Sequence, residues 1–211
     1  GRQTAYRVSI RRPTRDARVT PATRVHAMGC CLSISAAPGA RYAFLDIAID
    51  EQPAGRLVLQ LRPDLVPRTV RNFEELCRRE SGGYRGTKFH RIVPDVCVQG
   101  GECGSSIYGQ YFRDEKFDLG HLGRGTLYMA NLDEPNTNSS QFFICLAEYF
   151  TLHTKFVAFG KLIEGFELLD RLEAVGTNRG PTTAEVRIAD CGRLDGPLGS
   201  ASPSGNTKAA V

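Results

Sequence analysis

Residues Phe89–Gly101, which read FHRIVPDVCVQGG, decide the fold of this chain. Two short runs rich in β-forming residues are separated by Pro94-Asp95, a pattern typical of a strand, a turn and a second strand. The pattern places a fixed cation, Arg91, on one strand and an amide, Gln99, on its neighbour. We therefore expect these two polar side chains to lie close together on a sheet.

A second stretch, Met129–Ile144, reads MANLDEPNTNSSQFFI and complements the first. It supplies Asn131, a polar loop rich in turn-forming residues, and the apolar strand Phe142–Ile144. A guanidinium, two amides and a phenyl ring around a shallow apolar site suit an uncharged peptide better than a phosphate or a metal. These residues do not by themselves name a reaction.

The composition predicts one globular domain with tails. The chain has 211 residues, of which 41% are hydrophobic, and its 22 glycines and 11 prolines fit a turn-rich β architecture. No apolar run approaches the roughly 18 residues of a membrane-spanning helix. The net charge of +4 is modest, and arginines do not alternate with aromatic residues along one face. We expect no nucleic-acid partner.

The seven cysteines are odd in number and include no C-x-x-C pair. Most of them lie within apolar runs, where buried free thiols are the usual finding. This usage favours a reduced, intracellular compartment over a disulfide framework. His121 and His153 have no cysteine or carboxylate at ligand spacing, so no metal site is expected. His90 is expected to be a buried structural residue on the strand face opposite Arg91.

The remaining periodicities predict several strands and two helical segments. We expect strands at 42–49, 55–61, 156–162 and 186–189, and a turn at 50–53 that joins the first two into a hairpin. A helix begins at Asp64–Pro67 and ends by Gly82-Gly83, and a short second helix covers 166–172. The buried face of the first helix is formed by Val70, Phe73, Leu76 and Cys77. Many short strands with two helices predict a mainly-β barrel.

We expect the folded domain to span residues 40–194, between two disordered segments at 1–39 and 195–211. Residues 28–33 read MGCCLS, which fits the myristoylation pattern with Gly29 as acceptor. Cys30 and Cys31 are placed for palmitoylation, and a second acyl chain would make membrane attachment stable.

Three readings of this N-terminal segment compete. Met28 can be the true start, which exposes Gly29 for acylation. The seven arginines of residues 1–27 can mark a mitochondrial transit peptide, although Pro13 and Pro21 would interrupt its helix. The segment can also be a disordered extension without a targeting signal. The first reading is slightly favoured, which predicts a cytoplasmic protein with possible tethering through Gly29 and makes a mitochondrial location less favoured.

Several motifs, in order along the chain, resemble the cyclophilin family of peptidyl-prolyl cis-trans isomerases. They are FHRI-x-P followed by QGG, SIYG at Ser106–Gly109, MAN at Met129–Asn131, PNTN-x-SQFFI at Pro135–Ile144 and IADCG at Ile188–Gly192. The resemblance covers about 42–194. It implies a closed antiparallel barrel of eight strands capped by two α-helices, proline-containing peptides as partners, no cofactor and a monomeric protein.

The resemblance also implies roles for individual residues. Arg91 and Gln99 match the family's catalytic arginine and the glutamine that orients it. Asn131 matches the residue whose backbone pairs with the peptide, flanked by Ala130 and Leu132. Phe143 matches the floor of the proline pocket. The wall of the pocket is expected to be formed by Leu152, Thr151, Val96, Cys97 and Phe156.

At five places the sequence departs from the family pattern. Val96-Cys97 replaces a phenylalanine and a methionine, Thr151 replaces a tryptophan, and Phe156 replaces a histidine. Between MAN and PNTN the loop Leu132-Asp133-Glu134 is one residue longer, and the glycine-rich loop before Ser106 is several residues shorter. We therefore predict a divergent isomerase with weakened or altered activity and poor binding of the family's inhibitor cyclosporin. The alternative is a proline-peptide binding module or scaffold subunit in which turnover no longer matters, with a membrane tether as one form.

Overall fold

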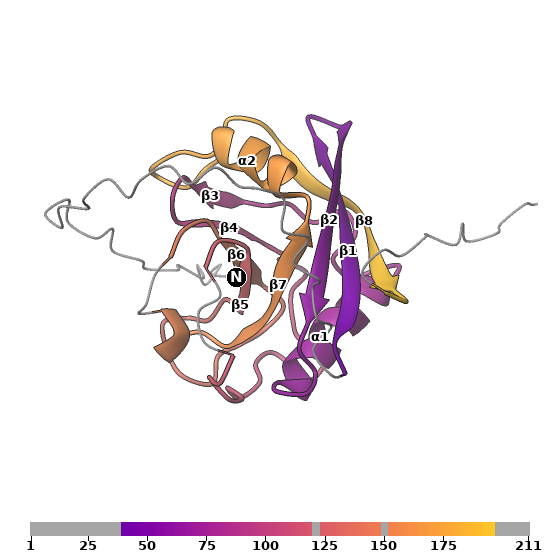
Figure 1. The fold of residues 1–211 in the computed structure, drawn as a ribbon, viewed down its shortest axis with the longest axis vertical. Helices are drawn as coiled ribbons and strands as arrows, with labels where there is room; N and C mark the ends of the chain where they lie inside the picture. Colours follow the sequence, from indigo (N-terminus) through magenta and orange to yellow (C-terminus); the bar gives the residue numbers. More distant parts are fainter. Residues whose placement is uncertain (1–38, 120–122, 149–151, 197–211) are drawn as a thin grey trace, which may run out of the picture.

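The computed structural model describes residues 39–119, 123–148 and 152–196. Eight antiparallel strands form one strongly curled sheet, accompanied by two α-helices (Figure 1). In chain order the elements are β1 (Arg41–Ile49), β2 (Gln52–Leu61), α1 (Pro67–Arg78), β3 (Arg91–Val93), β4 (Cys97–Gly100), β5 (Thr126–Met129), β6 (Phe142–Cys145), the 3₁₀ turn η1 (Leu152–Thr154), β7 (Ala158–Glu164), α2 (Phe166–Ala174) and β8 (Val186–Leu194). In the sheet the strands follow the order β3-β4-β6-β5-β7-β2-β1-β8.

The two end strands of this sheet, β3 and β8, are connected by hydrogen bonds between residues 86–89, which precede β3, and β8. The backbone N–H of Gly86 donates to Ile188 O at 2.8 Å, Ile188 N–H donates to Thr87 O at 2.9 Å, and Phe89 N–H donates to Val186 O at 2.9 Å. Only the isolated bridge between residues 88 and 187 has strand geometry there, and no β3–β8 ladder is present in the described residues. The prediction of a mainly-β fold with eight antiparallel strands and two helices is confirmed, but the sheet is open where a closed barrel was expected.

The β1–β2 hairpin turns more tightly than the sequence indicated. Asp50 and Glu51 both have positive φ, at 48° and 65°, as the central residues of a type I′ turn require. β2 therefore begins at Gln52, and the predicted turn at 50–53 is two residues too long. Pro53 pairs with Ala48 next to a register shift, the kind of position at which a strand tolerates a residue without an N–H.

Helix α1 begins at Pro67, as predicted, and buries the predicted apolar face of Val70, Phe73, Leu76 and Cys77 completely. No side chain of its own caps its first turn. Instead the Glu115 carboxylate accepts hydrogen bonds from Arg68 N–H at 3.1 Å and from Thr69 N–H at 2.7 Å. A carboxylate at the positive end of the helix dipole stabilises it. In α2, Leu168, Leu169 and Leu172 are buried, but Phe166 is exposed and does not belong to the buried face.

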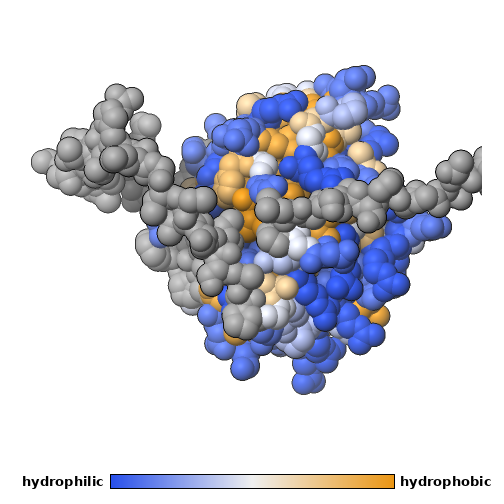
Figure 2. Space-filling view, turned by 45° about the vertical axis from the view of Figure 1, so that its right-hand side comes forward, coloured by the Kyte–Doolittle hydropathy of each residue, from blue (hydrophilic) through white to orange (hydrophobic). Residues whose placement is uncertain are grey.

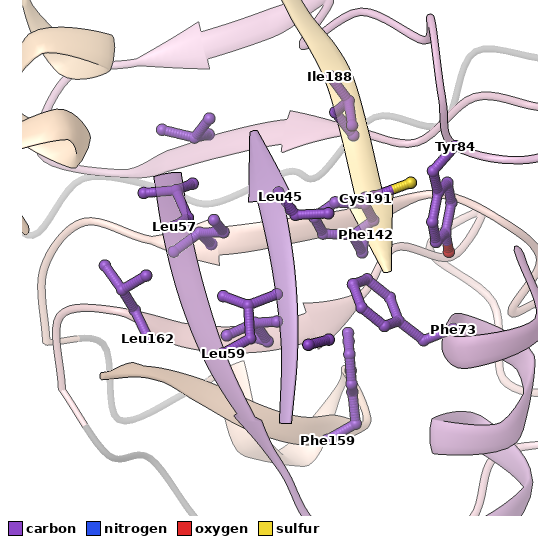
Figure 3. Close-up of a cluster of buried hydrophobic side chains, with 14 of the residues drawn as sticks. Leu45, Leu57, Leu59, Phe73, Tyr84, Phe142, Phe159, Leu162, Ile188 and Cys191 are labelled. Atoms are coloured by element: carbon purple, nitrogen blue, oxygen red, sulfur yellow. The ribbon is translucent and has the colours of Figure 1, made fainter. Parts of the chain in front are cut away.

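The alternation of side chains along the strands creates two separate apolar clusters. The main core lies inside the curled sheet, where the Phe73 ring packs against Tyr84, Phe142 and Phe159 with centroids 5.2 Å apart in each pair (Figure 3). A second cluster lies on the opposite face of β4, β5 and β6. This outer face carries the predicted site.

The outside of the molecule is largely polar on the face shown in Figure 2, with hydrophobic residues gathered in its upper part. Phe117 and Phe166 are the large apolar side chains most exposed within the described residues, at 38% and 39%. No helix in the described part of the chain has the length and apolarity to cross a bilayer. The predicted acylation residues Gly29, Cys30 and Cys31 lie outside the described residues, as does most of the tail at 195–211.

Candidate active site

Four polar and aromatic residues form one continuous row across four adjacent strands. Arg91 on β3 is paired with Gln99 on β4, Gln99 with Phe143 on β6, and Phe143 with Tyr128 on β5. Directly opposed residues of antiparallel strands have Cβ atoms about 5 Å apart and point to the same face. The sheet therefore brings the predicted cation, amide and phenyl ring together, as the two sequence stretches indicated.

The half-buried Arg91 side chain is held on two sides. Its Nη1 donates a hydrogen bond to Cys97 Sγ at 3.3 Å. Its stem lies against Gly180, whose carbonyl accepts a hydrogen bond from Ile92 N–H at 2.8 Å. Gly180 has φ 106°, and a Cβ added there would lie 3.0 Å from Arg91 Cγ. The guanidinium is thus positioned by the β3–β4 hairpin and by a glycine from the segment after α2.

The sulfur that contacts Arg91 is a neutral thiol at neutral pH. Burial raises the pKa of Cys97 to about 11, although the nearby Arg91 charge opposes the rise. Arg91 therefore donates to an uncharged acceptor and keeps its full positive charge for an additional partner. A neutral acceptor holds the guanidinium more weakly than a carboxylate would, since hydrogen bonds with both partners charged are stronger.

The amide of Gln99 is completely buried beneath the site. Its Nε2 donates to Gln141 Oε1 at 2.9 Å. Gln141 lies two residues before Phe143, so both side chains point to the outer face of the sheet. This contact links β4 to β6 at the level of the row.

An outer cluster of buried apolar residues surrounds Phe143. The Tyr128 ring stacks on Phe143 with centroids 5.2 Å apart and planes at 18°, and Phe156 meets it edge-on at 5.2 Å and 90°. The cluster consists of Val93, Val96, Cys97, Leu119, Tyr128, Ala130, Phe143, Cys145, Leu152, Phe156 and Ala158. Six predicted substrate-binding residues thus come together there: Val96, Cys97, Ala130, Phe143, Leu152 and Phe156.

Asn131 and Leu132 lie at the edge of this cluster, where the loop with the additional residue begins. Asn131 Nδ2 donates to Lys155 O at 2.9 Å, and its Oδ1 accepts from Asp133 N–H at 3.0 Å. Leu132 N–H donates to Thr137 Oγ1 at 2.9 Å. Asp133 has φ 64°, which lets the loop turn sharply. The Asn131 side chain therefore joins the loop to the segment just before Phe156.

Two other predictions have different outcomes. Thr151 lies outside the described residues. His90 is exposed just before β3, with Nδ1 4.0 Å from Glu102 Oε2, so the prediction of a buried structural histidine is wrong. In the described residues no three His, Cys, Asp or Glu side chains form a metal-binding group.

Tyr128 and Gln141 belong to the site but were not predicted. Both could have been found from the two-residue period, because Tyr128 alternates with Ala130 and Gln141 alternates with Phe143. Comparison with known families agrees with the geometry. Residues 44–193 match the family model described as cyclophilin type peptidyl-prolyl cis-trans isomerase/CLD.

Proposed function

Because this chain belongs to the cyclophilin-type peptidyl-prolyl cis-trans isomerase family, we propose that it accelerates rotation about X–Pro peptide bonds, with Arg91 as the catalytic residue. The observation that carries the proposal is the row of Arg91, Gln99 and Phe143 on adjacent strands. One cation, one amide and one aromatic ring thus lie at successive positions. Gln99 and Phe143 are both 0% exposed, so they contact a proline residue only when the outer cluster rearranges.

The reaction needs no nucleophile and no proton transfer. Resonance gives the peptide C–N bond partial double-bond character and a rotation barrier of about 18–20 kcal/mol. A catalyst lowers this barrier by binding the twisted amide more tightly than either planar isomer. When the amide twists, its nitrogen becomes pyramidal and regains a lone pair that can accept a hydrogen bond.

Each residue of the row has a distinct task in this mechanism. The Arg91 guanidinium donates to the nitrogen lone pair, an interaction that a planar amide cannot accept well. Gln99 holds the substrate carbonyl so that the bond rotates against a fixed end. Phe143 and Leu152 contact the proline ring, and the backbone of Asn131 pairs with the neighbouring peptide unit.

The test is NMR exchange spectroscopy of a proline tetrapeptide with the full chain, which detects slow turnover without a coupled protease. Arg91→Ala is expected to lower kcat/KM roughly a hundredfold, the usual loss on removal of one transition-state donor. Arg91→Lys should recover little, because an ammonium lacks the planar fork of the guanidinium. The matched control is Arg78→Ala, at an arginine of α1 that is 62% exposed. Equal turnover of Arg91→Ala and the control would reject the proposal.

A second candidate function is that of a proline-peptide binding module with little or no turnover. The observation that favours it is the burial of the outer cluster, since Phe143 is 0% exposed and Phe156 only 2%. These rings offer little apolar surface to a proline until the cluster rearranges. Peptide-induced chemical shift changes without accelerated exchange would favour the binding module over the enzyme.

Weak cyclosporin binding is part of the proposed function. The inhibitor depends on the family's tryptophan position, which Thr151 occupies here. Loss of one aromatic contact lowers binding by a few kcal/mol. A calorimetric titration that gave tight cyclosporin binding would contradict this expectation.

We also propose that acylation of Gly29 tethers the protein to a membrane. It depends on Met28 as the start and on the sequence MGCCLS. A chain that starts at Met28, coexpressed with a myristoyltransferase, should gain the mass of one myristoyl group, and Gly29→Ala should not. Absence of that mass from the unsubstituted chain would reject the tether and leave the isomerase proposal unaffected.

A further inference from the structure

A cavity of about 240 Å³ lies beside the outer cluster and is not used by the proposed chemistry. Its wall comes from three chain segments. Asp114 and Phe117 contribute from one, Asn131, Asp133 and Glu134 from the second, and Lys155 from the third. The volume is sufficient for one long side chain of a bound peptide.

The cavity shares two chain segments with the outer cluster. Asn131 lines the cavity and directly follows Ala130 of the outer cluster, while Lys155 directly precedes Phe156 of the same cluster. The hydrogen bond from Asn131 Nδ2 to Lys155 O fixes these two junctions relative to each other. A peptide held along the backbone of Asn131 would therefore lie next to a residue that lines the cavity.

The charges that line the cavity favour a cation. Asp133 and Glu134 are exposed, and within the described residues no ion pair involves either of them. Asp114 accepts hydrogen bonds from Asn136 N–H and Asn138 Nδ2, which are neutral donors and leave its negative charge in place. Lys155 is the cation among the lining residues. The lining thus carries three carboxylates and one ammonium group.

The aromatic wall of the cavity agrees with this charge. Phe117 lines it and is 38% exposed, which is unusual for a large apolar side chain. Lysine and arginine pack their aliphatic stems on apolar surfaces and keep the charged end near carboxylates. A guanidinium or ammonium over an aromatic face gains further attraction. A carboxylate or a purely apolar side chain would use only part of this lining.

We propose that this cavity is a specificity subsite for a lysine or arginine of the substrate, close in sequence to the isomerised proline. The inference rests on the proposed function, because it assumes that a proline peptide occupies the row of Arg91, Gln99 and Phe143. The expected substrates are proline-containing segments that carry a lysine or arginine near the proline. Asp133, which lies in the longer loop Leu132-Asp133-Glu134, is one of the carboxylates that would bind this basic side chain.

The experiment measures binding separately from turnover, with the full chain. Tetra- to hexapeptides carry one lysine or one glutamate at each of the two positions before and the two positions after the X–Pro bond. NMR shift titration gives Kd, and exchange spectroscopy on the same samples gives turnover. At one of these positions lysine should bind about three- to tenfold more tightly than glutamate, as expected for exposed charge pairs. The preference should decrease in high salt.

The variant Asp133→Asn, Glu134→Gln should reduce this lysine preference to near unity while it preserves side-chain size. The matched control, Glu164→Gln, Glu167→Gln, removes two exposed carboxylates at the junction of β7 and α2 and should preserve the preference. Equal affinity for lysine and glutamate at all four positions, or a preference unchanged in the Asp133/Glu134 variant, would overturn the subsite. Selective binding without accelerated exchange would support the subsite and overturn the proposed isomerase activity instead.

Discussion

Cys97 Sγ accepts a hydrogen bond from Arg91 Nη1 at 3.3 Å, so a thiol positions the cation of the site. The two residues lie diagonally across the β3–β4 hairpin, since Arg91 faces Gln99 and Cys97 faces Val93. Diagonal neighbours on one sheet face are within reach of long side chains. The residue that departs from the family pattern therefore contacts the residue proposed to perform the chemistry.

We predict that Cys97→Val lowers turnover about fivefold, because Arg91 loses one hydrogen-bond acceptor worth about 1 kcal/mol. Cys97→Ser keeps an acceptor and should retain most of the activity. NMR exchange spectroscopy measures both variants, and the peptide Kd is expected to change little. Turnover that falls equally in the two variants would show that the contact with Arg91 does not position it.

Gly180→Ala is predicted to lower turnover although residue 180 lies far from β3 in the sequence. The new Cβ would lie 3.0 Å from Arg91 Cγ and would displace the guanidinium. Gly104→Ala is the matched control, because Gly104 has a similar φ of 102° and open space around it. Both variants should lose roughly 1–3 kcal/mol of stability through backbone strain. Equal turnover in the two would contradict this role of Gly180.

Glu115→Ala is predicted to lower the free energy of unfolding by about 1–2 kcal/mol. It removes the acceptor of the Arg68 and Thr69 backbone N–H groups at the start of α1. Urea denaturation measures the change. Asp118→Ala, at an exposed residue nearby, is the control and should leave the midpoint almost unchanged. A midpoint for Glu115→Ala within error of the control would disprove this cap.

Phe156→Ala is predicted to destabilise the fold by about 3–4 kcal/mol, since the ring is 2% exposed and packs edge-on against Phe143. Phe117→Ala, at a ring that is 38% exposed, should cost much less. Chemical denaturation compares the two. Similar losses would mean that the outer cluster is not a packed unit.

Stability is predicted to fall as the pH rises from about 9 to 11. Burial raises the pKa of Cys97 and of Cys145 to about 11 each, above the ordinary 9.0. In this range the unfolded chain loses thiol protons that the folded chain keeps, so the free energy of unfolding decreases by roughly 2–3 kcal/mol per thiol. The double variant Cys97→Val, Cys145→Val should show a weaker decline in denaturation experiments at pH 8, 9, 10 and 11. Part of the decline should remain, because burial also raises the pKa of Cys77 and of Cys103. The same decline as in the unsubstituted chain would contradict the assignment.

Local patterns were sufficient to predict most of the fold. The Pro94-Asp95 turn and the flanking β-formers predicted the hairpin that pairs Arg91 with Gln99, because register follows from the turn. Helical spacing predicted the buried face of α1. The exact turn at Asp50-Glu51 was missed because Pro53 looked like a breaker, while its position beside a bulge lets it remain in β2.

Contacts between distant segments could not be predicted. Glu115 caps a helix that begins 48 residues earlier, at Pro67. Gly180 packs against the side chain of Arg91 on β3. Neither contact leaves a local signal, since each depends on how the sheet curls. The Arg91–Cys97 contact also depends on side-chain rotamers, which a strand pattern does not specify. The open junction between β3 and β8 likewise follows from the geometry of residues 86–89.

The pairing of β1 with β8 has a consequence for how this protein is made. Tyr42 on β1 lies opposite Leu194 on β8. Of the strands in this sheet, β1 is synthesised first, and its outer edge is covered only when β8, the last, has been made. Until β8 has been synthesised, the outer edge of β1 stays unpaired, although β2 can already pair with β7. The sheet is therefore complete only once Leu194 has been synthesised, and until then the backbone N–H and C=O groups along the free edge of β1 can pair with another strand.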